Sequence, residues 1–196
     1  MKKKVVIIGL VIGFFVALGS ICFLFFFGGF PEVHRQKQQY GTWKKFAGYS
    51  GLKVFPDNIH EEDILYYYYK SQDTIFSPVC QICLETTYEE SDFEKEVKRI
   101  SQISINYNGK KNKILNDKEN FNAEAYICEY NWNHCYEYAL IVPETQQITY
   151  VFLQNVNKSE VKFDLDWLPD HYEEKDNSLI YCIYAFGSGK DEMQYE

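Results

Sequence analysis

The sequence lacks charged residues in one long stretch near its N-terminus. It has few basic residues after that stretch, and few motifs for catalysis anywhere. No Asp, Glu, Lys or Arg occurs between Val5 and Phe30. All 28 acidic residues follow that stretch, with 17 of the 20 basic ones, so residues 31–196 have a net charge of about −11. No catalytic or cofactor motif, internal repeat or low-complexity tract stands out. These absences favour a membrane segment followed by one acidic domain, and more likely a non-enzyme than an enzyme.

The negative charge disfavours two classes of partner. Nucleic acids and anionic lipid headgroups are polyanionic surfaces, so the body of an acidic domain is repelled by both. Cationic peptides remain compatible with it. The 17 tyrosines and three tryptophans are numerous for this length, and such rings serve cores, protein interfaces and sugar-stacking platforms alike. We expect no nucleic-acid partner, cofactor or metal.

The uncharged stretch Val5–Phe30 predicts a single transmembrane helix. Apolar runs longer than about 18 residues cross membranes as helices, which satisfy their own backbone hydrogen bonds in lipid. At ~1.5 Å per residue the run is about 39 Å long, so the helix must tilt or end early. The alternative is a cleaved signal peptide with Val5–Val16 as its apolar region and a site near Ala17-Leu18-Gly19. Cleavage there would expose an apolar tail, Ile21–Phe27, which favours the uncleaved anchor.

Flanking charges bear on orientation. Lys2, Lys3 and Lys4 precede the helix, while four basic residues follow closely: Arg35, Lys37, Lys44 and Lys45. Because the basic counts on the two sides are similar, the positive-inside rule alone decides little. The tail of residues 1–4 is too short to hold a domain, so we expect a signal anchor in the cell membrane, N-terminus inside and domain outside. The Lys-, Asn-, Ile- and Tyr-rich composition favours a bacterial origin.

One face of the predicted helix carries small residues. Gly9, Gly13 and Ala17 recur every four positions, and this spacing lets a second helix approach closely. Glycine is also common in membrane helices without such a role. A homodimer through this face is therefore one hypothesis for a partner.

We expect residues 31–56 to be a juxtamembrane connector and residues 57–196 to be the extracytoplasmic domain. The connector interleaves basic and aromatic residues, including Arg35, Lys37 and Tyr40, a mixture favoured at membrane interfaces. A solvated stalk is the alternative for this segment.

The domain pattern predicts an α+β fold, in which helices pack on one face of a mainly antiparallel sheet. A helix from Asp57 or Asn58 to about Lys70 and a second from a capping box at Ser91–Glu94 to about Ile103 are expected. Phe93, Val97 and Ile100 form the apolar stripe of the second helix. Residues 106–120 are expected to be a loop. Predicted strands cover 79–88, 123–130, 135–142, 147–154, 161–167 and 179–186.

The cysteines give two expectations. Cys80 and Cys83 have the spacing of a redox or zinc pair, but three positions apart on a strand they point to opposite faces. Cys128 and Cys135 would face each other if their hairpin were centred between Asn131 and Trp132, which would allow a disulfide outside the cell. Buried unpaired cysteines are the alternative, because they are common.

Three functions remain open. The first is a partner-binding domain that uses exposed aromatic residues at Tyr66, Tyr67, Tyr68 and Tyr69 and at the hairpin tip with Trp132 and His134. The second is a receptor for a small ligand, peptide or sugar, in which the same rings are stacking platforms; a concave aromatic pocket would favour it. The third is a carboxylate-dependent envelope hydrolase using Asp164 and Asp166, which one strand face would hold about 6.6–7 Å apart.

Overall fold

The computed structural model describes residues 2–27, 30–41, 52–72, 79–107, 110–132, 135–170 and 172. It begins with helix α1, Lys2–Phe27, which ends inside the predicted span. Every residue from Ile7 to Leu24 is exposed, and this stretch is long and apolar enough to cross a membrane. A signal sequence meets the same criteria of length and composition. The predicted apolar helix is therefore present.

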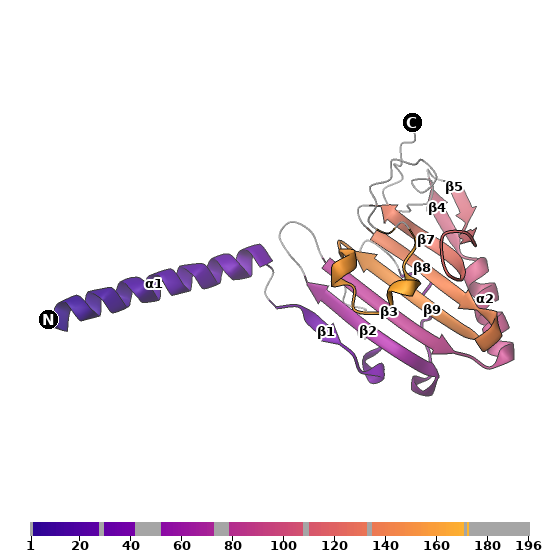
Figure 1. Cartoon of the computed structure of the whole chain (residues 1–196), viewed down its shortest axis with the longest axis horizontal. Coiled ribbons are helices and arrows are strands. Elements are labelled where there is room, and N and C mark those ends of the chain that lie inside the picture. The colour runs from indigo at the N-terminus through magenta and orange to yellow at the C-terminus, as the bar shows by residue number, and fades with distance from the viewer. Residues whose placement is uncertain are drawn as a thin grey trace.

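The centre of the domain is one antiparallel sheet of seven strands in the order β1-β2-β3-β9-β8-β7-β6 (Figure 1). Its members are β1 (Glu32–His34), β2 (Ile64–Gln72), β3 (Val79–Thr87), β6 (Leu115–Asp117), β7 (Glu124–Trp132), β8 (Cys135–Val142) and β9 (Gln147–Gln154). A separate hairpin pairs β4 (Ser104–Tyr107) with β5 (Lys110–Lys113). Together with α1 and α2 (Glu90–Ser101), this is an α+β fold, as predicted.

The sheet is buried on both faces because alternate residues of its central strands are apolar on each side. In β9, Tyr150 and Phe152 belong to one hydrophobic cluster, which also contains Phe93 and Ile100 of α2. Val151 and Leu153 belong to the other cluster, together with apolar residues of the segment 156–170. We call these the helix-side face and the loop-side face.

The amphipathic helix α2 closely follows the prediction. Phe93 and Ile100 are buried and Val97 packs against the same cluster. The N-cap is Glu89 and its side chain makes no capping bond, so the capping box expected at Ser91–Glu94 is wrong. In the part of the chain that the structure describes, α2 is the one α-helix packed on the sheet, so the predicted layer of several helices is not shown.

The helix expected from residue 57 to residue 70 is wrong. Glu61–Asp63 forms a short 3-10 helix, and the tyrosine run continues into β2. Consecutive aromatic side chains favour a strand, where they alternate between two packed faces. Tyr67 belongs to the helix-side cluster and Tyr66 packs against the loop-side cluster. The prediction gave the acidic first turn more weight than the β preference of the residues that follow it.

Two further expectations differ from the structure. Residues 106–120 are not a simple loop, because they contain β5, β6 and the end of β4. Residues 161–167 are not a strand but end in a 3-10 helix, Leu165–Trp167. Their alternating apolar residues cover the loop-side face, where Val161 and Phe163 are buried. Alternation there reflects packing of an irregular segment. The strand expected at 179–186 lies outside the described residues.

The structure bears on both pairs of cysteines. Cys80 belongs to the helix-side cluster and Cys83 to the loop-side cluster, so the pair points to opposite faces. Cys128 and Cys135 are not bonded to each other. Cys135 pairs instead with Trp132, and a register shift lies between Ile127 and Glu129. Already before this shift Ile127 pairs with Tyr138, so no part of the observed register places Cys128 opposite Cys135.

Ile100 provides a test of how α2 is held. Its side chain is fully buried, so Ile100→Ala leaves a cavity and should lower the free energy of unfolding by about 2–5 kcal/mol. Urea unfolding of the full-length protein in detergent micelles, followed by tryptophan fluorescence, measures this change. Lys95→Ala on the exposed side of α2 is the control and should change it by less than about 0.5 kcal/mol. Equal effects of the two substitutions would contradict the packing described.

Candidate functional site

A pocket of about 350 Å³ opens beside β1 and β2. It contains aliphatic, aromatic and cationic side chains, and its described lining residues are Arg35, Lys37, Leu65, Tyr66, Tyr67, Tyr68 and Lys162. Three of these lining residues are cationic and none is acidic. In a domain with an excess of carboxylates, this local arrangement favours an anionic ligand.

One wall of the pocket is formed by the chain that leaves β1. His34 of β1 is opposite Tyr69 in the register, so Arg35 follows directly beside Tyr68. The Arg35 guanidinium carbon lies 5.5 Å from the centroid of the Tyr68 ring, a cation–π contact. Burial raises the pKa of Tyr68, and the charge of Arg35 acts in the opposite direction. The tyrosine ring therefore orients an exposed guanidinium at the pocket.

The opposite wall is held by two polar side chains of the sheet. The Tyr66 hydroxyl donates a hydrogen bond to the Lys162 carbonyl over 2.9 Å. The amide of Gln81, a fully buried side chain, donates to the Glu160 carbonyl and its oxygen accepts from the Lys162 N–H. Because the carbonyl and N–H of Lys162 are both hydrogen-bonded, its backbone is held at the pocket wall.

The Tyr66 hydroxyl remains a donor over the physiological pH range. Burial raises its pKa to about 12, with smaller contributions from neighbouring groups. The Tyr66 ring also makes an edge contact with Trp167 at 5.9 Å between centroids. The ring is thus wedged between β2 and the segment that covers the loop-side face, and it supplies rigid aromatic surface at the pocket.

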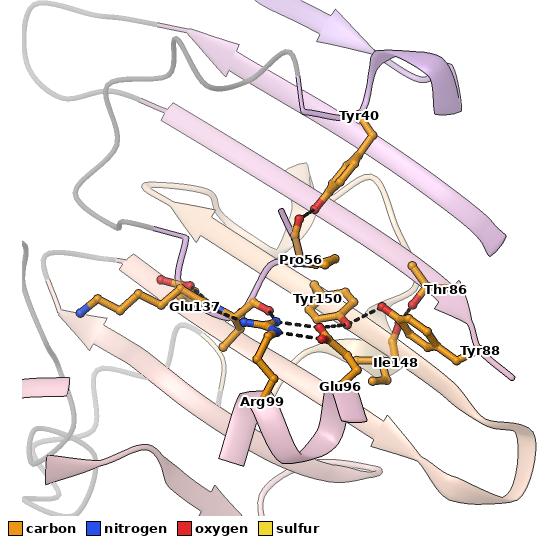
Figure 2. Close-up of polar contacts among 11 residues, drawn as sticks. Tyr40, Pro56, Thr86, Tyr88, Glu96, Arg99, Glu137, Ile148 and Tyr150 are labelled. Carbon is orange, nitrogen blue, oxygen red and sulfur yellow. Dashed lines mark hydrogen bonds and ion pairs between the residues drawn. The ribbon is translucent and has the colours of Figure 1, made fainter. Parts of the chain in front are cut away.

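Tyr40, which follows the Arg35–Lys37 wall in the chain, and α2 both make polar contacts with residues 53–56 (Figure 2). The Tyr40 hydroxyl donates to the Pro56 carbonyl, and its ring meets Tyr67 edge-on. Arg99 of α2 donates to the carbonyls of Lys53 and Val54. These contacts fix residues 53–56, which in turn hold Tyr40 and the chain leading from the pocket.

The same network contains the densest group of titratable side chains. Glu96 accepts hydrogen bonds from Arg99 and from the Tyr150 hydroxyl, the latter at 2.8 Å. The hydroxyls of Tyr150 and Tyr88 lie 2.8 Å apart, and burial raises the pKa of Tyr88 to about 12. Glu137 accepts from the Val54 N–H at 2.9 Å. Because these contacts join α2 to β9 and to residues 53–54, the cluster helps to organise the fold.

The residues predicted for binding are distributed unevenly. Tyr66, Tyr67 and Tyr68 line the pocket. Their exposure was overestimated, because Tyr67, Tyr68 and Tyr69 are all buried. Tyr69 packs against His34 at 5.0 Å between ring centroids. The Trp132 side chain and His134 lie outside the described residues.

Other predicted groups lie apart from the pocket. The exposed residues Gly9, Gly13 and Ala17 share the described helix α1. Asp164 accepts a hydrogen bond from the Asp166 N–H at 3.0 Å and caps the 3-10 helix there. This local cap replaces the strand face on which a carboxylate pair was expected. Among the described residues, no three His, Cys, Asp or Glu side chains are grouped to hold a metal ion.

Sequence reasoning missed Lys162 as a site residue. Arg35 and Lys37 were noted only for a possible membrane-interface role, and no motif relates them to a lysine more than a hundred positions away. The connection arises from the sheet, because Gln81 and Tyr66 hold residues 160–162 beside β2. The positions of Arg35, Lys37 and Lys162 in the sequence contain no signal for this contact.

Comparison with known proteins adds no assignment: no protein-family model matches the sequence, and no curated protein or solved structure is significantly similar to it.

Glu85 lies in the sheet opposite Tyr66, and burial followed by repulsion from Asp164 raises its pKa above the usual 4.5. A raised folded-state pKa means that folding is favoured while Glu85 is protonated and loses this advantage as the pH rises. Glu85→Gln should therefore increase the free energy of unfolding at pH 7 relative to the unsubstituted protein. Below about pH 4 the difference should shrink, because the carboxyl is then protonated in both states.

Urea unfolding at a series of pH values measures the effect of Glu85→Gln. Glu144→Gln, at an exposed position, is the control for loss of one negative charge. A gain that is independent of pH, or equal in the two variants, would contradict the stated cause.

Proposed function

We propose that this protein is a single-pass membrane-anchored binding protein whose domain takes an anionic ligand in the pocket between Arg35 and Lys162. The single observation that carries the proposal is the charge of the pocket. Three cationic side chains lie there and none of the described lining residues is a carboxylate, although the chain as a whole has a net charge of −8. Several cations at a concave site whose described lining contains no carboxylate favour a bound anion.

The concave shape supports a small ligand over a flat protein interface. A volume of about 350 Å³ lies at the lower end of the range for small-molecule sites. The rings of Tyr66 and Tyr68 supply apolar surface, and Arg35 and Lys37 supply charge. A carboxylate- or phosphate-bearing group is the chemistry that such a lining recognises, since guanidinium and ammonium groups bind both.

The structure gives no comparable support to the hydrolase hypothesis. That hypothesis required Asp164 and Asp166 to share one face of a strand, and residues 165–167 form a 3-10 helix instead. Asp164 is engaged by the Asp166 amide. Glu96, with Tyr150 and Arg99, is enclosed by its own hydrogen-bond partners. A binding role therefore accounts for more of the described side chains.

Anion binding can be tested with the full-length protein in a zwitterionic detergent. Phosphate and citrate should raise the midpoint of thermal unfolding above that in chloride of equal ionic strength, because a ligand that binds only the folded state stabilises it. The increase should disappear in the variant Arg35→Gln/Lys37→Gln/Lys162→Gln.

A matched control for anion binding removes three exposed cations elsewhere: Lys95→Gln/Lys98→Gln/Lys113→Gln. This variant should keep the full response to phosphate and citrate. If both triple variants respond like the unsubstituted protein, the anions act through general solvent effects and the pocket is not their site.

The proposed topology places the domain outside the cell. The described cysteines outside α1 are all buried, so an added cysteine at Lys95, with a side chain that is 75% exposed, gives a clear signal. A membrane-impermeant maleimide should label Lys95→Cys in intact cells, and the unsubstituted protein should serve as background. Labelling that requires lysis would place the domain in the cytosol.

A further inference from the structure

We propose that the rim of the pocket docks on the surface of the bilayer that holds α1, and that the pocket receives a phosphate group of a lipid headgroup. This inference rests on the proposed function, because it names the anion and its source. It also defines an orientation of the domain, with the β1–β2 edge toward the membrane.

Exposed apolar side chains occur in the same segments as the basic residues of the pocket. Among the described residues outside α1, four large hydrophobic side chains are exposed: Phe30 at 86%, Val33 at 41%, Leu65 at 43% and Leu165 at 48%. Phe30 and Val33 precede Arg35 by five and two residues, and Leu65 lines the pocket itself. Leu165 lies on the same covering segment as Lys162. Exposed apolar residues beside cations are the composition of surfaces that insert into a headgroup layer.

The strand geometry aligns these groups on one face of the edge strand. His34 contacts Tyr69 on the helix-side face. Because side chains alternate along a strand, Val33 and Arg35 point to the loop-side face. Lys70, opposite Val33 in the register, adds another cation beside this apolar residue. The alternation thus places Val33 and Arg35 on one face of β1 and His34, which packs into the domain, on the other.

The chain keeps this edge close to the membrane. Helix α1 ends at Phe27 and β1 begins at Glu32. Five Cα–Cα steps of about 3.8 Å separate these residues by at most ~19 Å, whatever the path between them. No other strand of the sheet is tethered so closely to the helix. Attachment of this kind gives the β1–β2 edge a high effective concentration at the headgroup layer, so weak contacts suffice for docking.

Charge determines which side of the domain can approach the membrane. The acidic body is repelled by anionic lipids, as its composition predicted, while each basic residue near such a surface is attracted by roughly 1 kcal/mol. Three carboxylates near the basic edge have contacts within the protein. Glu32 contacts His34 at 2.8 Å, Asp164 accepts from the Asp166 amide, and Glu85 lies half-buried in the sheet opposite Tyr66. Repulsion over the body and attraction at Arg35, Lys37 and Lys162 therefore favour one orientation.

Phosphate fits the lining better than a carboxylate when the source is a bilayer. The Arg35 guanidinium can bind two oxygens of one phosphate, and two ammonium groups share the remaining charge. Leu65 and Tyr66 then face the glycerol and upper acyl region, where aliphatic and amphipathic aromatic side chains are favoured. A free phosphate compound would use the same cations without the exposed apolar rim.

The experiment uses the full-length protein in nanodiscs of phosphatidylglycerol and phosphatidylcholine. A nitroxide is attached at Leu65→Cys, in a background in which Cys22 and Cys182 are replaced by serine, and its collisions with oxygen and with a water-soluble nickel chelate are measured. We expect position 65 to be lipid-embedded in phosphatidylglycerol. A nitroxide at Lys95→Cys should stay in water, because α2 lies on the other face of the sheet.

The triple variant Arg35→Gln/Lys37→Gln/Lys162→Gln should shift the docking equilibrium in phosphatidylglycerol roughly a hundredfold toward the undocked state, at about fivefold per basic residue. The matched variant Lys95→Gln/Lys98→Gln/Lys113→Gln should dock normally. Soluble glycerol 3-phosphate, added in excess, should compete with the bilayer for the pocket and partly release position 65 into water.

The outcomes separate this inference from the proposed function. If phosphate stabilises the protein but position 65 remains in water in every nanodisc, the pocket binds a soluble anion and the docking inference is overturned. Docking that is unchanged in the pocket variant would show that the apolar rim acts without the phosphate site, which also overturns it. If neither anion binding nor docking occurs, both proposals fail. Docking that depends on the three cations supports both.

Discussion

The burial of β9 on both faces is the constraint on which the rest of the structure depends. This strand is paired along its length with β3 on one side and β8 on the other. Every residue from Ile148 to Gln154 is buried, so neither face can remain open to water. One face requires α2 and residues 52–56, and the other requires residues 156–170. A helix alone cannot complete this domain, and the irregular covering segment is as necessary as α2.

The proposed site depends on the segments that cover both faces of the sheet. On the helix-side face, Arg99 holds residues 53–54, and Pro56 accepts from Tyr40, which lies on the chain that leaves the pocket. On the loop-side face, Gln81 and Tyr66 hold Lys162. The tyrosine run of β2 connects the two, because alternate rings contribute to opposite sides. Polar contacts buried for structural reasons thus position the cations at the edge of the sheet.

The sequence was most informative where one physical signal dominated. Strands 135–142 and 147–154 were predicted with their observed ends, because turn residues bound two strongly apolar runs. The stripe of α2 was found from Phe93, Val97 and Ile100. Prediction was wrong where two signals competed, as at residues 57–70, where acidic residues suited a helix start and four tyrosines suited a strand. The alternation at 161–167 came from packing against a sheet, which the sequence alone does not distinguish from sheet membership.

The short strand β1 has a mechanical consequence. Any pull on the protein from its helix enters the domain at Glu32, and three residue pairs join β1 to β2. Eight pairs join β2 to β3 behind it. Under tension the first register to yield is therefore β1, and Arg35 directly follows this strand. In the proposed membrane-anchored protein, lateral drag on the helix would reach the pocket wall before it disturbed the core.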